Sequence, residues 1–251
     1  MTIGGRVPAW ISTVAILAGI VLLLQLAAAL GLTNTFLLPS PLQIAAAYPG
    51  LIGDEGLLVR LAITAGEVFT AAVLAILIGG LLGWGLYRSR DAWTAYAGWL
   101  VGLNAAPLIM LYPLFLMFFG RGVTTVIVLG VLGALPAIAV KTREAFATVS
   151  KVLLAVGLSF NLTPGRQFRL IHLPAATPAI VAGVRLGCFY ALTSVIGAEF
   201  LTGIGGLGAL IPDLADRYKL GAMYGAIVFV VITSAVFITV VNRAGRWLRP
   251  T

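Results

Sequence analysis

Six long apolar segments constrain the fold of this chain more than any other feature of its sequence. They cover residues 9–32, 61–87, 92–119, 123–140, 174–200 and 220–241. A helix that crosses a bilayer needs about 20 mainly apolar residues, because lipid offers no partner for backbone N–H and C=O groups. The sequence therefore predicts an all-α integral membrane protein with about six transmembrane helices, forming a single transmembrane domain over residues 1–251.

The first apolar segment has an alternative interpretation as a cleaved secretion signal. Arg6 precedes it, and Ala27, Ala28 and Ala29 resemble a small-residue cleavage site. However, a signal peptide has an apolar stretch of only about 7–15 residues, and this one is longer. We therefore expect the segment to stay in the membrane as a helix.

Basic residues divide unequally between the two predicted sides of the membrane. Of sixteen Lys and Arg residues, eleven fall on the side of the N-terminus, four on the opposite side, and Arg185 within a span. Because cytoplasmic loops are enriched in Lys and Arg, both termini are predicted to be cytoplasmic. The cytoplasmic group comprises Arg6, Arg88, Arg90, Lys141, Arg143, Lys151, Arg166, Arg169, Arg243, Arg246 and Arg249. Its last three members form a helical stripe, which predicts an anchor at the lipid headgroups or, alternatively, a lipid-specific site.

The composition excludes several classes of protein. With 61% hydrophobic and 10% charged residues, the chain is neither an ordinary cytosolic enzyme nor disordered. Its net charge of +8 reflects basic residues in the predicted cytoplasmic loops and not a nucleic-acid partner. One cysteine, Cys188, and one histidine, His172, exclude a disulfide framework and a multi-histidine metal centre. Residues 203–208 match G-x-G-x-x-G, but they follow a membrane helix rather than a strand, so we interpret them as a turn.

Small residues recur every fourth position along the second span. This periodicity predicts a helix face that another helix approaches closely, either within the chain or in a second subunit. The face consists of Glu67, Ala71, Ala75, Gly79 and Gly83.

The third span carries features typical of a transport pathway. Asn104, Pro107, Tyr112 and Pro113 lie within ten residues, and prolines interrupt backbone hydrogen bonds. Broken helices often line substrate paths, although they are also often plain kinks. Ser194, on the fifth span, is a further candidate pathway residue.

Ionisable groups inside a membrane are functional candidates, because their burial is costly. Here these are Glu67 and Glu199, although Glu67 and Arg185 could instead extend toward the interface. Nothing in the sequence spacing pairs them, so no proton relay is inferred.

The longest predicted cytoplasmic connection covers residues 141–173. A helical pattern begins at Glu144, Asn161 and the Pro164–Gly165 pair form a breaker, and a second helical piece follows Arg166. Two helical pieces joined by a turn predict a docking element, with a simple linker as the alternative.

This connection resembles the signature loop of the membrane subunits of bacterial ABC importers, E-A-A-x3-G-x9-I-x-L-P. Ile171, Leu173 and Pro174 match its end, Asn161 stands at the glycine, and the E-A-A positions are occupied without an acidic residue. Four further stretches resemble the nitrate, sulfonate and taurine branch of that family. They are residues 38–43, 106–120, 173–185 and 198–208.

The resemblance implies a permease subunit that is not an enzyme and binds no cofactor itself. Two copies, as a homodimer or heterodimer, would form the path in the bacterial plasma (inner) membrane. Two separate ABC ATPase subunits would bind ATP and Mg, and a periplasmic or lipid-anchored binding protein would deliver a small anion or a vitamin precursor. The loop residues expected to contact the ATPase are Ala155, Val156, Gly157, Ser159, Phe160, Asn161, Leu162 and Thr163, followed by Ile171, Leu173 and Pro174.

Two other classes of function remain as alternatives. A secondary transporter driven by an ion gradient would need coupling acids and, typically, an internal repeat. The sequence shows no internal repeat, and its only candidate coupling acids are Glu67 and Glu199. A membrane-embedded enzyme would need a nucleophile–base pair or metal cluster that the sequence does not offer. The absence of G-x-x-x-x-G-K-[ST] excludes a P-loop in this chain.

Overall fold

The computed structural model describes residues 9–247, and this part of the chain is helical and contains no strand. The elements are α1 (Ala9–Ala29), α2 (Pro41–Ala46), α3 (Tyr48–Gly53), α4 (Leu57–Arg88), α5 (Arg90–Ala105), η1 (Leu108–Leu111), α6 (Tyr112–Phe119), α7 (Val123–Ala147), α8 (Lys151–Ser159), α9 (Pro164–Gln167), η2 (Phe168–His172), α10 (Leu173–Thr202), α11 (Leu207–Asp216) and α12 (Leu220–Trp247).

Five of the described helical segments are long and apolar enough to cross a membrane, and a sixth span arises if one bent pair is counted. This confirms the predicted all-α membrane fold. The predicted third span is that bent pair, in which residues 90–105 and 108–119 meet at 89°. Several spans run further than predicted: α4 begins at Leu57, α7 continues to Ala147 and α12 to Trp247.

The centre of the molecule is a bundle of α4, α7 and α10. Its buried residues are mostly alanine, valine and leucine, and small side chains let the helix backbones approach closely. A Cβ added at Gly79 would lie 3.0 Å from the Leu135 carbonyl oxygen, and one at Gly83 would lie 2.5 Å from that of Ala139. The small face of the second span therefore packs against α7 of the same chain.

The bend between α5 and η1 follows from Pro107. Ala106 is extended, with φ −74° and ψ 139°, which is the backbone conformation favoured before proline. Proline also has no N–H with which to continue the α5 hydrogen-bond ladder. Pro113, in contrast, lies in the first turn of α6, where proline is tolerated, so only Pro107 breaks the span.

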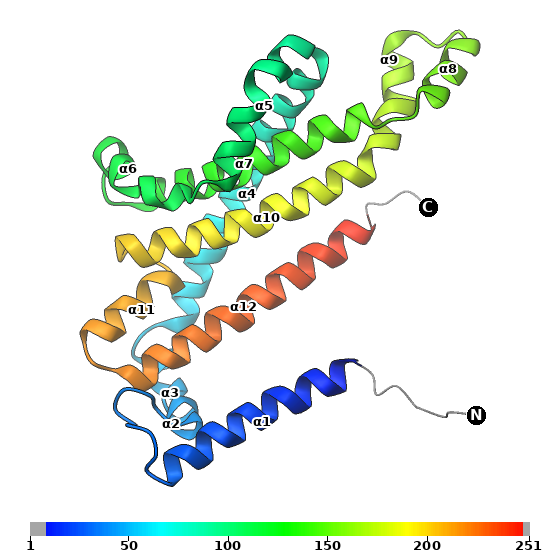
Figure 1. Cartoon of the computed structure of the whole chain (residues 1–251). Coiled ribbons are helices and arrows are strands. Elements are labelled where there is room, and N and C mark those ends of the chain that lie inside the picture. Colours follow the sequence, from blue (N-terminus) through cyan, green and yellow to red (C-terminus); the bar gives the residue numbers. More distant parts are fainter. Residues whose placement is uncertain (1–8, 248–251) are drawn as a thin grey trace, which may run out of the picture.

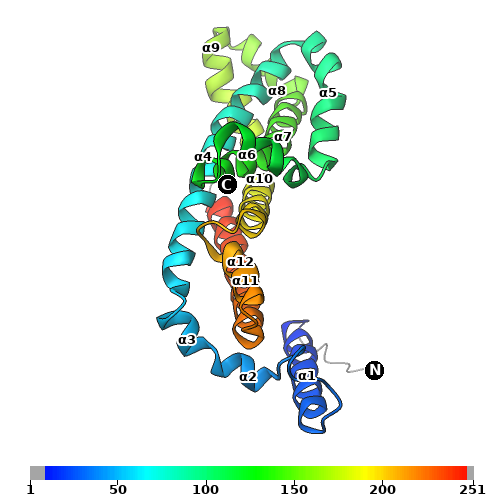
Figure 2. The same cartoon turned by 90° about the vertical axis from the view of Figure 1, so that its left-hand side faces the viewer.

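Helix α1 stands apart from the bundle, as Figure 2 shows. It contacts α2, and the backbone N–H of Leu42 donates to the side-chain oxygen of Gln25 over 3.2 Å. The predicted span begins at the same residue as α1, and its apolar side chains are exposed along its length.

Figure 1 places the two ends of α10 at opposite ends of the molecule. The α8–α9 segment lies near the start of α10, on the side where the described chain begins at α1 and ends at α12. Helix α11 lies at the other end, together with α2 and α3.

Candidate functional site

A polar pocket lies where the bent third span faces α10. Its volume is about 250 Å³, and none of its lining residues is charged. The Ile109 side chain lies against Gly197 of α10, which positions the break on the bundle. The lining residues are Leu103, Asn104, Ala106, Pro107, Leu108, Ile109, Gly133, Tyr190, Thr193 and Ser194.

Three of the seven predicted pathway residues meet in this pocket: Asn104, Pro107 and Ser194. Tyr112 instead packs against the α4–α7–α10 core, and Pro113 is exposed at the start of α6. The remaining two, Glu67 and Glu199, are buried at another place in the bundle.

The pocket also contains residues that the sequence did not single out, namely Gly133, Tyr190 and Thr193. Tyr190, Thr193 and Ser194 are spaced so that they share one face of α10, and this spacing is a usable signal in the sequence. Gly133 carries no such signal, because its role depends on α10: a Cβ there would collide with the Ser194 hydroxyl.

Within the predicted docking loop, residues 141–173, the part beyond α7 is called the coupling segment here, after its predicted role. It covers residues 151–172 and consists of α8, a turn, α9 and η2. The turn is a Schellman motif: Leu162 N–H donates to the Gly157 carbonyl over 3.2 Å, and Asn161 N–H donates to that of Leu158 over 2.9 Å. Asn161 has φ 51°, the left-handed conformation that asparagine and glycine tolerate. This explains how asparagine can occupy the expected glycine position.

Gly157 and Ile171, both predicted loop residues, lie directly against each other. A Cβ on Gly157 would be 2.7 Å from Ile171 Cδ1, and Gln167 Nε2 donates to the Leu154 carbonyl over 2.7 Å. These contacts fold α8 back onto η2. Of the other predicted loop residues, Leu162 is half-buried, whereas the rest are exposed: Ala155, Val156, Ser159, Phe160, Asn161, Thr163, Leu173 and Pro174.

An aromatic cluster connects the coupling segment to the bundle. His172 lies edge-on to Tyr87 of α4 and Phe146 of α7, with ring centroids 5.3 and 5.6 Å away, and Phe168 packs beside Phe146 at 5.9 Å. His172 Nε2 is also 3.2 Å from the Phe146 carbonyl oxygen. Movement of this segment would therefore be transmitted to α4, α7 and α10 together.

The corner where α10 turns into α11 against α4 is called the outer corner here, after the side on which the sequence predicts it. It brings together two glutamates that the sequence left unrelated. Glu67 lies beside Gly205 and Glu199 beside the adjoining Gly206, and their exposed fractions are 3% and 0%. Neither extends toward the interface, so that interpretation of Glu67 is wrong. Sequence spacing does not pair these two acids, and only the tertiary fold brings residues so far apart in the sequence together.

Glycines at the outer corner make room for these acids. A Cβ at Gly206 would collide with the Glu199 carboxylate and the Thr64 hydroxyl, and one at Gly208 would collide with the Ile196 carbonyl oxygen. Gly203 and Gly205 have φ of 66° and 86°. The G-x-G-x-x-G match is thus a tightly packed turn, as interpreted, and not a nucleotide loop.

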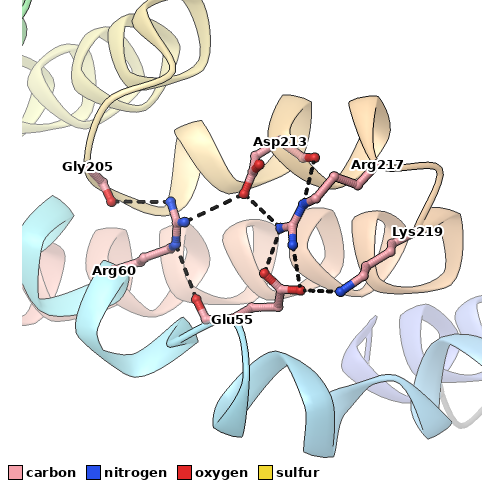
Figure 3. A network of polar contacts seen from close by, with 6 residues as sticks. All are labelled: Glu55, Arg60, Gly205, Asp213, Arg217 and Lys219. Carbon is pink, nitrogen blue, oxygen red and sulfur yellow. Dashed lines mark hydrogen bonds and ion pairs between the residues drawn. The ribbon is translucent and has the colours of Figure 1, made fainter.

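A network of charged side chains connects the start of α4 with α11 and the following turn (Figure 3). The Arg217 guanidinium donates to both oxygens of Glu55, over 3.1 and 2.6 Å, and to Asp213 Oδ2 over 2.8 Å. Lys219 Nζ donates to Glu55 Oε1 over 2.8 Å. Arg60 lies 3.6 Å from Asp213 and donates to the carbonyls of Glu55 and Gly205.

Glu55 is the centre of this network. Hydrogen bonds from Arg217 and Lys219 lower the pKa of its carboxyl to about 2, and only 9% of its side chain is exposed. The hydrogen bond from Arg217 to Glu55, together with the nearby charge of Asp213, raises the pKa of Arg217. Three of the four basic residues predicted on the side opposite the N-terminus belong to this network: Arg60, Arg217 and Lys219. The network links the α3–α4 connection to the α11–α12 turn.

The chain is similar to known membrane components of transport systems. It matches the family model described as binding-protein-dependent transport system inner membrane component over residues 75–251. It is 31% identical over 185 residues to a choline transport system permease protein of Bacillus subtilis (strain 168), covering 72% of this chain and 82% of the relative. A glycine betaine/proline betaine transport system permease protein of Escherichia coli (strain K12) is 29% identical over 195 residues, covering 78% and 55%.

A solved structure shares the fold. A chain from inward facing conformations of the MetNI methionine ABC transporter superposes with a TM-score of 0.67 at 20% identity, covering 77% of this chain and 96% of the other. The sequence resemblance is thereby confirmed, because the family match covers the bent span, the coupling segment and the turn from α10 to α11. The chain belongs to the family of inner membrane components of binding-protein-dependent transport systems.

Proposed function

We propose that this chain forms half of the translocation path of an ATP-driven importer and has no ATPase site of its own. A second copy, most simply in a homodimer, would complete the path. Two separate ABC ATPase subunits would supply ATP hydrolysis with Mg, and a periplasmic or lipid-anchored binding protein would deliver the substrate. The exposed apolar coupling segment is the observation that carries this proposal.

The coupling segment has the chemistry of a docking element. Val152, Leu158 and Phe160 expose most of their side chains, and Phe160, at 75%, stands at the turn itself. Apolar side chains at the end of a membrane protein need a protein partner if they are not to contact water. An apolar helix laid in a groove is a common recognition mode, and a surface groove on an ATPase would provide it. Pressure on this segment would reach the bundle through the His172 cluster.

The orientation in the membrane follows from the same element. The coupling segment lies at the end where α1 begins and α12 ends (Figure 1). If the ATPase is cytoplasmic, both termini are cytoplasmic, as the distribution of Lys and Arg predicts. The network around Glu55 then faces the outside of the bacterial plasma membrane, and lipid covers the exposed apolar helix faces.

The polar pocket is proposed as the part of the path that this chain contributes. Its volume of about 250 Å³ is below the roughly 300–1,000 Å³ of complete small-molecule sites, as expected for half of a shared path. The amide of Asn104 and the hydroxyls of Tyr190 and Ser194 offer hydrogen bonds without charge. Replacing Asn104 with leucine should slow uptake and leave ATPase binding intact, whereas Thr94→Val on the same helix should change neither.

The substrate is proposed to be a small polar solute that the binding protein selects. Relatives are named for choline, for glycine betaine and proline betaine, and for riboflavin, so their names cover different charges and sizes. An uncharged pocket lining imposes no charge of its own on the solute. A small anion of the nitrate, sulfonate or taurine kind, or a vitamin precursor, stays the prediction from sequence. Ligand bound to the co-purified binding protein would identify it.

Uptake into vesicles tests the driving force. The permease would be reconstituted with its ATPase and binding protein, and the predicted uptake requires ATP and no ion gradient. Uptake that continues without ATP but stops when a proton or sodium gradient is collapsed would instead support the secondary transporter.

Removal of residues 155–163 tests the coupling segment. The deletion should uncouple or release the ATPase, and a replacement of Asn161 that does not tolerate its positive φ should weaken ATPase binding, while the permease still inserts and purifies as a folded protein. If the deletion variant retained the ATPase at the wild-type yield and transported normally, the docking role would be disproved.

A further inference from the structure

The carboxyl group of Glu67 is buried without any donor to stabilise it as an anion. Its residue is 3% exposed, and no N–H or O–H group in the described part of the chain donates to either oxygen. It faces the outer corner, where one of its oxygens would lie 3.8 Å from a Cβ at Gly205. An ionised carboxylate in such a place costs several kcal/mol unless a cation or donors compensate it.

Its neighbour Glu199 has the opposite surroundings. Thr64 Oγ1 donates to Glu199 Oε1 over 2.7 Å, and the backbone N–H of Gly208 donates to Oε2 over 2.8 Å. Gly208 lies in the first turn of α11, a ten-residue helix whose N-terminal dipole also favours a negative charge. Thr64 Oγ1 in turn accepts from Leu207 N–H over 2.8 Å. Glu199 is therefore stabilised as an anion, and Glu67 is not.

The charged groups around this pair do not neutralise Glu67. Arg60 of α4 reaches the Gly205 carbonyl and Asp213 of α11, as Figure 3 shows. Arg121, which precedes α7, donates to the Thr202 carbonyl over 2.6 Å. Within residues 9–247, no ion pair includes Glu67. Two adjacent buried carboxyls, one of them held as an anion, leave the other to carry a proton.

We propose that Glu67 is a proton-binding site of the outer corner: it holds one proton per chain at neutral pH and faces the carboxylate of Glu199. The bound proton removes the repulsion between the two acids and keeps α4 closed against the α10–α11 turn. Separation of these helices would admit water and release the proton. The inference goes beyond the proposed function, because it concerns this corner whatever energy source drives transport.

Infrared spectroscopy of the full transporter in lipid tests where the proton lies. At neutral pH the wild type should show the C=O stretching band of a protonated, buried carboxylic acid. Glu67→Gln should abolish the band, and Glu144→Gln should retain it, because Glu144 is exposed and paired with Lys141 over 2.8 Å. A wild type without the band, or a band that persists in Glu67→Gln, would overturn the proposal.

Thermal unfolding against pH gives an independent measurement on the same samples. Because the folded corner keeps a proton that the unfolded chain releases above the ordinary pKa of a glutamate, wild-type stability should fall as the pH rises from the acid range through neutral pH. Glu67→Gln mimics the protonated acid, so it should fold at the wild-type yield and lose this contribution to the fall. A Glu67→Gln variant that does not fold, or whose stability falls with pH as steeply as that of the wild type, contradicts the proposal.

A metal cation between the two acids is the competing occupant. Replacing potassium with sodium at constant ionic strength separates the two cases. A proton site predicts the same melting temperature in both salts. If sodium stabilised the wild type and Glu67→Gln abolished that effect, the site would bind a metal cation and not a proton.

Discussion

The two turns that flank α10 differ in whether their backbone groups and side chains find partners within this chain. At the outer corner the backbone, Thr64 and Glu199 find partners within the chain, and glycines remove every Cβ that would interfere. At the coupling segment the backbone is satisfied by the Schellman turn, but the apolar side chains of Val156 and Phe160 face outward. One turn is complete in a single chain, and the other is incomplete without a partner.

Because of this difference, we expect mutations to affect stability at one turn and assembly at the other. Substitutions at the outer corner should change the stability of the permease itself, because they remove internal contacts. Substitutions on the exposed face of the coupling segment should change assembly and leave the fold intact. Five substitutions test this difference, and the one with the greatest predicted effect comes first.

The Gly206→Ala substitution should have the largest effect. A Cβ there collides with the Glu199 carboxylate and the Thr64 hydroxyl, so the turn must move and its hydrogen bonds must break. We expect a loss of more than about 3 kcal/mol of stability, seen as a fall in folded yield and melting temperature. Gly53→Ala, with no atom within 4 Å of its Cβ, is the control. A Gly206→Ala protein as stable as this control would refute the tight packing.

The Thr64→Val substitution keeps the shape of the side chain and removes its hydroxyl. Glu199 loses a donor and the Leu207 N–H loses its acceptor, both at buried positions. The expected cost is about 2–4 kcal/mol in thermal or denaturant unfolding. Thr70→Val on the same helix removes an exposed hydroxyl that binds only its own backbone, and should cost under about 0.5 kcal/mol. Equal effects of the two variants would contradict a special role for Thr64.

The Phe160→Ser substitution should act on assembly rather than on folding. An exposed aromatic anchor of an interface typically contributes more than about 1.4 kcal/mol, so ATPase binding should weaken at least about tenfold. The melting temperature of the isolated permease should not change. Tyr218→Ser, which alters an equally exposed aromatic residue near the outer network, is the control for ATPase affinity. Equal ATPase affinity in both variants would argue against docking through this turn.

The Asn161→Ala substitution should have a smaller effect in the same turn. Its φ of 51° costs roughly 1–2 kcal/mol for alanine and little for glycine. We therefore expect Asn161→Ala to weaken ATPase binding modestly and Asn161→Gly to restore it. If glycine were as harmful as alanine, the asparagine side chain itself, and not its backbone conformation, would be required.

The Glu55→Gln substitution should have the smallest effect, because its cation partners are solvent-exposed. The folded-state pKa of Glu55, about 2, lies below its ordinary value of 4.5, so its stabilising contribution is present above pH 4.5. It is lost as the pH falls toward 2. The melting temperature of Glu55→Gln should lie slightly below wild type at neutral pH, and the gap should close in acid. A gap that does not change with pH would contradict this origin.

The number and approximate position of the spans could be predicted from the sequence because apolar length is a local property. Their ends could not, because α7 and α12 continue past the apolar segments. The break at Pro107 was predictable for the same reason, since proline acts on its own backbone. The angle of 89° was not, because it depends on how Ile109 seats against Gly197 of α10. In the pathway set, the local pattern found Asn104, Pro107 and Ser194 but could not add Gly133.

The coupling segment illustrates a different limit. Its family signature could be aligned from Ile171 to Pro174, and Asn161 was recognised as a replacement for glycine because both accept positive φ. The contact between Gly157 and Ile171 depends on α8 folding back on η2, which no spacing rule states. Sequence therefore located the docking element, and tertiary contacts defined which of its faces is free.

From the sequence alone it followed that this chain spans a membrane, roughly which segments span it, and to which family it belongs. These conclusions rest on apolar segments, prolines and short motifs, all of which act locally. Only the tertiary structure decided that the small face of α4 packs against α7, and that Glu67 meets Glu199 at the outer corner. The physical reason is that the cost of a buried charge depends on the donors around it. Those donors come from α4 and α11, and only the folded chain brings them to α10.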